Sequence, residues 1–218
     1  MSILILCDHE NGQLSPVTLN AVSAASQIGG EMHLLVAGDQ TGNVAKAAAS
    51  IAGIAKVLVA DDKALENGLA ENLAPLMQSL SVSYSHMMAA ATTTGKNVMP
   101  RLAALLDVMQ ISDIIKIEDA NTFQRPIYAG NALSTVSSSE AIKVITVRGT
   151  AFEAAAAEGG NAAIEPVAGA SDAGLSAYVK SELSSSERPE LTSASIDLGI
   201  NCDFRWTRHA RWRQFCHA

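Results

Sequence analysis

Side chains capable of metal or acid–base chemistry gather in two short stretches, each directly after an apolar run. Asp8-His9-Glu10 follows the run over residues 3–7, and Asp61-Asp62 follows the run over residues 57–60. If these runs are parallel strands, both stretches lie at carboxyl ends, where ligands of open α/β sheets bind. A pair of carboxylates there could hold a metal ion. We favour a solvated polar loop for the first stretch and an ordinary turn for the second.

Other charged residues offer less chemistry. Residues 96–101, with Gly95 before them, could anchor an anion at a helix start, and a helix cap with surface charge explains them equally well. His33 and His86 stand alone beside predicted strands, which favours structural roles. Spacing alone supports no Ser/His/Asp or Cys/His set.

Neither of the common phosphate-binding loops is present. The chain contains no G-x-x-x-x-G-K-[ST], no G-x-G-x-x-G follows the first predicted strand, and the loop after Cys7 holds a single glycine, Gly12. A fold of this class without either loop is not a standard dinucleotide or P-loop site.

The elements that must position these residues alternate regularly along the chain. Strands are predicted over residues 3–7, 33–37, 57–60, 84–89, 112–117 and 141–148. One helix is predicted to begin at Ser15-Pro16, with Ser15 as N-cap, and to stop at Gly29. Further helices are predicted over residues 43–52, 65–80 and 96–109. This alternation predicts an α/β, Rossmann-like parallel sheet with helices on both faces.

Composition and charge exclude several classes of protein. Hydrophobic residues make up 48% of the 218 residues, which is enough for a full core. The net charge of −7 leaves no broad basic field, so we expect no nucleic-acid partner. No apolar run approaches the roughly 20 residues of a membrane helix, and residues 1–6 lack the basic start of a signal or transit peptide. We therefore expect a cytoplasmic protein without membrane insertion, in which Cys7 is a small buried hydrophobe.

The character of the chain changes after about residue 154. Residues 154–186 are rich in Ala, Ser, Gly and Glu, residues 178–183 form a candidate final strand, and residues 184–194 have linker composition. We predict an α/β domain over residues 1–183, a linker over 184–197 and an aberrant tail over 198–218.

The stretch from 111 to 152 is the most informative. It predicts a strand, a loop anchored by Arg-Pro and Tyr, a Gly-Asn turn, and a second strand that ends in Arg-Gly-Thr. Its segments R-P-I-Y-A-G-N-A and K-V-I-T-V-R-G-T-A-F resemble the signature of electron-transfer flavoprotein alpha subunits. The resemblance covers essentially residues 1–194, including the S-E-R-P-E-L segment of the linker.

This resemblance implies an electron-carrier subunit rather than an enzyme. In that family the N-terminal domain is a scaffold that packs against a beta subunit in a heterodimer, and a C-terminal domain carries most of the FAD contacts. The flavin takes electrons from acyl-CoA and related dehydrogenases and passes them to a membrane quinone oxidoreductase, while the beta subunit holds AMP. No metal and no covalent catalysis is implied. The residues that could serve the subunit interface, or instead tie a long loop to the sheet, are Arg125, Tyr128, Asn131 and Arg148.

The end of the chain departs from the family pattern. The family's FAD domain begins with a G-G-R-G motif, which is expected directly after Ala194 and is absent from this sequence. Residues 201–218 instead hold both tryptophans, two of the three cysteines and four of the eight arginines. A nucleic-acid-binding tail and a zinc site are two interpretations, but neither fits an acidic single domain, and the spacing matches no zinc module. The residues of that zinc site would be Cys202, His209, Cys216 and His217.

A shifted reading frame explains this tail better. The tryptophan codon ends in G-G, so reading one base out of phase places a glycine there. From Cys202 onward the shifted codons allow V-I-S-G-G-R-G-M-Q-G-G-D-N-F, and Trp206 and Trp212 each require a glycine. On this hypothesis the full-length parent binds FAD and this chain does not. The alternatives are a cofactor-free α/β interaction module and a small adenine-nucleotide-binding domain.

Overall fold

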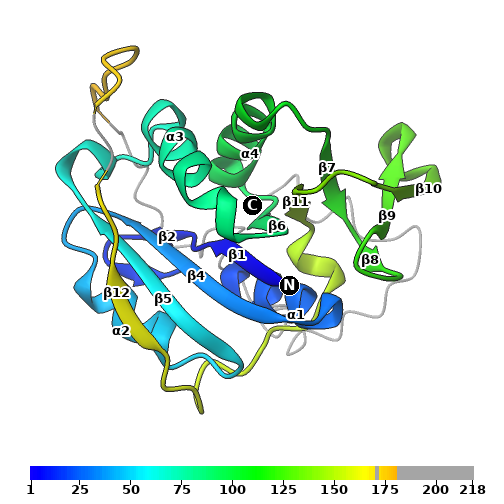
Figure 1. Cartoon of the computed structure of the whole chain (residues 1–218), viewed down its shortest axis with the longest axis horizontal. Coiled ribbons are helices and arrows are strands. Elements are labelled where there is room, and N and C mark those ends of the chain that lie inside the picture. The colour runs from blue at the N-terminus through cyan, green and yellow to red at the C-terminus, as the bar shows by residue number, and fades with distance from the viewer. Residues whose placement is uncertain (170–171, 181–218) are drawn as a thin grey trace, which may run out of the picture. The chain divides into compact units, whose positions relative to one another are not determined.

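A seven-stranded parallel sheet forms the centre of the fold (Figure 1). The computed structural model describes residues 1–169 and 172–180. The strand order is β12-β5-β4-β1-β6-β11-β7, and all six neighbouring pairs are parallel. The strands are β1 (Ser2–Leu6), β4 (Glu31–Gly38), β5 (Ile54–Asp61), β6 (His86–Ala90), β7 (Gln110–Ile114), β11 (Lys143–Val147) and β12 (Ala163–Pro166). The predicted α/β class is confirmed.

Helices cover both faces of this sheet because its central strand β1 is apolar and buried from Ile3 to Leu6. Ile3 and Ile5 of β1 pack in one core with α1 (Val17–Ile28) and α2 (Gly42–Ala49). Leu4 and Leu6 pack in a second core with α3 (Ala70–Leu80) and α4 (Thr93–Leu106). Successive strand residues point to opposite faces, so β1 must be covered on both. Figure 1 shows the two helix pairs on opposite sides of the sheet. Among the described residues, none of the helices is long and apolar enough to cross a membrane.

One predicted helix cap and one predicted helix start are wrong. Ser15 does not cap α1 with its side chain; Pro16 occupies the cap position, and the Ser15 carbonyl accepts a hydrogen bond from the Thr18 amide at 3.0 Å. The helix predicted from residue 65 begins at residue 70, because Gly68 adopts a left-handed φ of 60° before it. The residues before Gly68 form a 3-10 turn (Lys63–Leu65) instead.

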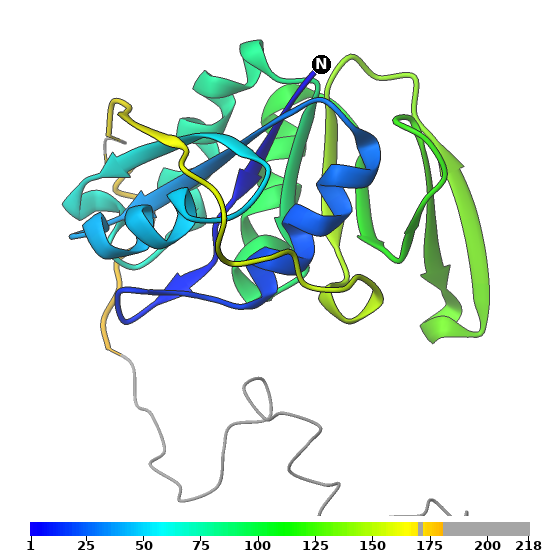
Figure 2. The ribbon, with the colours of Figure 1, turned by 90° about the horizontal axis from the view of Figure 1, so that it is seen from below.

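A second, antiparallel sheet stands beside the main one and replaces most of the predicted loop. It contains β8 (Lys116–Ile117), β9 (Thr122–Ile127) and β10 (Ala132–Ser137), in the order β10-β9-β8. The hairpin of β9 and β10, residues 122–137, is called the arm below. Figures 1 and 2 both place it on the opposite side of the molecule from α2.

The final strand is not where the composition placed it. β12 pairs with β5 and forms one edge of the main sheet. Residues 178–180 have no regular secondary structure, and residues 181–183 lie outside the described residues. All four residues of β12 are exposed, so backbone pairing rather than a buried side-chain pattern holds it, and hydrophobic periodicity could not reveal it. The predicted linker and tail, residues 184–218, also lie outside the described residues.

Candidate functional site

The residues after β1 hold neighbouring elements together. The His9 ring forms a 2.9 Å hydrogen bond through Nε2 with the carbonyl of Ala37. It also covers Gly38, where a Cβ would lie 2.9 Å from the ring carbon Cε1. Thr18 Oγ1 accepts a hydrogen bond from the Asp8 amide at 3.1 Å, which ties this loop to α1. Cys7, at the end of β1, is buried as predicted, and burial raises the pKa of its thiol.

The acidic pair Asp61-Asp62, at the end of β5, shapes a turn. The Asp61 carboxylate accepts hydrogen bonds from the amides of Gln40 and Thr41 at 2.9 and 3.2 Å, and so secures the loop before α2. The Asp62 carboxylate accepts one from the Ala64 amide at 2.9 Å. Within the part of the chain that the structure describes, no three His, Cys, Asp or Glu side chains are grouped to hold a metal ion. The proposed zinc ligands of the tail lie outside that part.

Lys96 and Arg101, the basic residues of the stretch 96–101, belong to α4, the helix that Thr92 caps. Its hydroxyl accepts a hydrogen bond from the Gly95 amide at 3.3 Å. Arg101 forms a 3.4 Å ion pair with Glu71 and so links α4 to α3. The described contacts therefore match the helix-cap interpretation of this stretch.

His33 is buried and joins the exposed Glu31 and the buried Tyr84 in a polar cluster near the amino ends of the strands. Its Nδ1 lies 2.7 Å from the hydroxyl of Tyr84, and its Nε2 lies 3.0 Å from Oε1 of Glu31. Burial and the nearby Glu31 carboxylate raise the pKa of Tyr84 to about 12. The hydrogen bond from His33 lowers the pKa of Glu31. These contacts join the start of β4 to the residues before β6.

His86 bridges β6 to the loop before the arm. Its Nε2 lies 2.7 Å from the carbonyl of Ala120, which can only accept, so Nε2 carries the proton and Nδ1 accepts from the Ser85 hydroxyl at 2.9 Å. The side chain is 1% exposed. Burial, and to a smaller extent the charge of Lys143, lower the pKa of His86.

We expect this bridge to make stability depend on pH. His86 titrates near pH 6.5 when unfolded and lower when folded, so its contribution is complete above about pH 6.5 and is lost as the pH falls toward the folded pKa. The slope should stay below about 1.4 kcal/mol per pH unit, the limit for one proton. Urea unfolding at several pH values measures it. His86→Gln keeps a donor for Ala120 without titrating, so an unchanged slope in this variant would assign the effect to other groups.

The four residues suggested for an interface fall into two groups. Arg125, Tyr128 and Asn131 belong to the arm, whereas Arg148 follows β11. Tyr128 is 78% exposed and stands at the tip, so it does not tie the arm to the sheet. Asn131 is also exposed, and its amide closes the turn by donating to the Tyr128 carbonyl at 3.1 Å.

The tip of the arm has an uncommon backbone conformation. Tyr128, Ala129 and Gly130 are consecutive and have φ values of 50°, 54° and 88°. Non-glycine residues in this region are strained and cluster at binding and switch sites. Leu133, opposite Pro126 in the register, is 62% exposed and extends an apolar surface from the tip.

Arg148 is held internally. Its Nε lies 3.1 Å from both carboxylate oxygens of Asp113 in β7, and Nη2 completes a two-pronged pair. This hydrogen bonding raises the pKa of Arg148. Asp113 has a φ of 60°, and its amide donates to the Thr146 hydroxyl at 2.9 Å. The pair thus locks an irregular point in β7, the strand beside the arm.

Sequence reasoning missed the residues that attach the arm. Phe123 is fully buried in the core of the main sheet, and the partner of Arg148 is Asp113. The signal for the arm was present, because T-F-Q-R-P-I and A-L-S-T-V-S flank a short Gly-containing turn in the manner of a hairpin.

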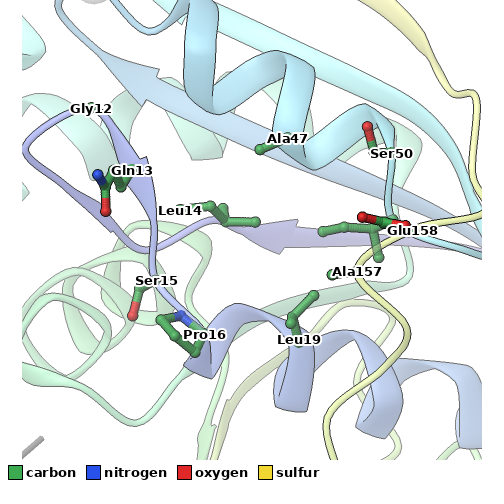
Figure 3. Close-up of a pocket in the computed structure, with 11 residues that line it drawn as sticks. Gly12, Gln13, Leu14, Ser15, Pro16, Leu19, Ala47, Ser50, Ala157 and Glu158 are labelled. Carbon is green, nitrogen blue, oxygen red and sulfur yellow. The ribbon is translucent and has the colours of Figure 1, made fainter. Parts of the chain in front are cut away.

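A pocket of about 480 Å³ lies between the hairpin of β2 (His9–Glu10) and β3 (Gln13–Leu14), the start of α1 and the end of α2. Figure 3 shows Leu14, Pro16 and Leu19 along one side and Ala47 and Ser50 along the other, with Glu158 beside them. No basic side chain lines it, and Glu158 would repel a phosphate.

Comparison with known proteins gives the family. Residues 3–172 match the electron transfer flavoprotein domain. The chain belongs to the electron transfer flavoprotein family. It is 57% identical over 196 residues to the electron transfer flavoprotein subunit alpha of Pseudomonas aeruginosa, which covers 90% of this chain and 63% of that protein. The same subunit of Paracoccus denitrificans is 50% identical over 195 residues, covering 89% of this chain and 63% of that protein.

This chain thus spans a little under two thirds of the length of these relatives. It corresponds to the N-terminal domain of the electron transfer flavoprotein alpha subunit. The pocket described above does not fit a flavin nucleotide. His9 covers the carboxyl end of β4 at Gly38, and the pocket offers a carboxylate where a pyrophosphate needs donors.

Proposed function

We propose that this chain is the scaffold part of an electron transfer flavoprotein alpha subunit. The full-length parent carries electrons from acyl-CoA and related dehydrogenases, through FAD, to a quinone oxidoreductase, as a heterodimer with a beta subunit that holds AMP. The observation that carries this proposal is the 57% identity over 90% of the chain to a protein of that name. The chain spans 63% of the length of that relative, and we assign FAD binding to the part of the parent outside this match.

The scaffold contributes a surface for the beta subunit, and we assign that role to the arm. Tyr128 and Leu133 expose apolar side chains on a tip whose strained backbone the hairpin holds in place. Tyrosine is among the residues that most often anchor protein interfaces, which makes Tyr128 the main candidate anchor. Asn131 shapes the tip, and Arg148 acts indirectly, because its pair with Asp113 fixes the strand beside the arm.

Flavin binding belongs to the parent rather than to this chain. No basic side chain lines the described pocket, and the possible codons from Cys202, read one base out of phase, allow the missing G-G-R-G motif. We therefore assign residues 1–183 to the scaffold domain, 184–197 to a linker and 198–218 to a frameshifted tail. The chain requires no metal and no nucleic acid, and it works in the cytoplasm.

Coexpression with the beta subunit of the same organism tests the proposal. The chain should copurify with the beta subunit and lack the absorption bands of flavin. Resequencing the codons for Leu191 to Cys202 should show one base too many or too few. The chain read in the corrected frame should copurify with flavin that an acyl-CoA dehydrogenase reduces. An unchanged frame would refute the frameshift, and failure of both chains to bind the beta subunit would refute the function.

A further inference from the structure

Arg125 is the only arginine among residues 1–169 and 172–180 that has no carboxylate partner. Arg101 pairs with Glu71, and Arg148 pairs with Asp113. The Nε atom of Arg125 is buried, and it has no hydrogen-bond partner among these described residues. Buried donors in native proteins are almost always satisfied, so each exception requires an explanation.

The position of Arg125 on the arm suggests where the missing acceptor comes from. Arg125 lies two residues beyond Phe123 on the same face of β9, opposite Ser134 of β10. The exposed fraction is 0% at Phe123 in this strand and 78% at Tyr128 directly after it. Arg125 therefore lies between the buried core and the exposed tip of the arm. No acidic residue shares this face of the arm, whose members are Phe123, Arg125, Ile127, Ala132, Ser134 and Val136.

We propose that Arg125 binds a carboxylate of the beta subunit in the center of the interface that the arm forms. This inference rests on the proposed heterodimer. A guanidinium presents a planar fork of donors that matches a carboxylate with two parallel hydrogen bonds. Ile127 and Ala132, which are half-buried on the same face, and the exposed Tyr128 at the tip exclude water around such a pair once the partner covers them.

Contacts within this chain hold the arm, and with it Arg125, in a fixed position without the partner. Phe123 anchors its base in the core, and the bond from His86 to the Ala120 carbonyl fixes the loop that leads into it. The pair of Asp113 and Arg148 holds the adjacent strand β7. A donor that is already oriented costs less conformational entropy on binding, which favours a tight and specific contact.

Titration calorimetry of the chain against the purified beta subunit tests the inference. Arg125→Glu should weaken association by about thirtyfold or more, as expected for a desolvated charge pair. Arg125→Lys, which keeps the charge and loses the fork, should weaken it less. Lys46→Glu makes the same change of charge at an exposed position of α2, across the main sheet from the arm, and should bind like the wild type.

Each outcome of this titration has a distinct meaning. If neither the wild-type chain nor the chain read in the corrected frame binds the beta subunit, the proposed function fails. If the wild-type chain binds and Arg125→Glu binds equally well, only the present inference fails. The midpoint of urea unfolding of free Arg125→Glu should match that of the wild type, because no described residue pairs with Arg125; a large decrease would show an internal role and overturn the inference. Replacement of one acidic residue of the beta subunit by arginine should restore binding of Arg125→Glu.

Discussion

Replacing Gly95 by alanine should destabilise the protein by about 3 kcal/mol, at the upper end of the range for overpacked cores. A Cβ at Gly95 would lie 2.0 Å from the carbonyl oxygen of Ala90 and 3.4 Å from Cβ of Ala89. The obstacle is backbone rather than a flexible side chain, so α4 would have to move away from the end of β6. Val98 and Leu102, which are fully buried on this helix, would then lose their packing.

Urea unfolding followed by far-ultraviolet circular dichroism measures this loss. Gly42→Ala is the matched control, because Gly42 also begins a helix and a Cβ there meets nothing within 4 Å. That substitution should be neutral or stabilise the protein by up to about 1 kcal/mol, since alanine favours helix more than glycine does. Equal effects at the two positions would show that the approach of α4 to β6 is not the limiting contact.

Replacing Phe123 by alanine should cost about 3–5 kcal/mol, the usual range for deleting a buried aromatic side chain. Phe123 is 0% exposed and belongs to the same core cluster as the central strands, although it comes from the small sheet. The cavity would therefore form where the arm joins the body. Faster hydrogen exchange of the amides of residues 122–137 should accompany the loss of stability, because this side chain anchors the hairpin.

Leu133→Ala provides the contrast on the opposite strand of the same hairpin. Leu133 is 62% exposed, so its removal should change the free energy of unfolding by less than about 0.5 kcal/mol. Binding to the beta subunit should nevertheless weaken, because Leu133 lies in the proposed interface. A Phe123→Ala protein as stable as the wild type would mean that the arm is not anchored as the structure indicates.

The sequence by itself determined the fold class, most strand positions and the family. Residues 3–7 form an apolar run without alternation, which is the mark of a strand buried on both faces, and the structure confirms a buried strand there as β1. The family followed from the segments around Arg125 and Arg148, which the match over residues 3–172 supports. These features can be predicted from the sequence because a strand buried on both faces needs apolar residues at successive positions, and because a family motif is a local run of residues.

Tertiary structure alone decided the features that depend on distant partners. β12 is held by backbone hydrogen bonds to β5, so its exposed side chains carry no signal of the pairing. Nothing in the sequence distinguishes Arg125 from Arg148 by its pairing. The fold brings Asp113, 35 residues away in the sequence, next to Arg148, and it brings no described carboxylate next to Arg125. Whether a charge is paired depends on which strands become neighbours, and that is settled only when the sheet assembles.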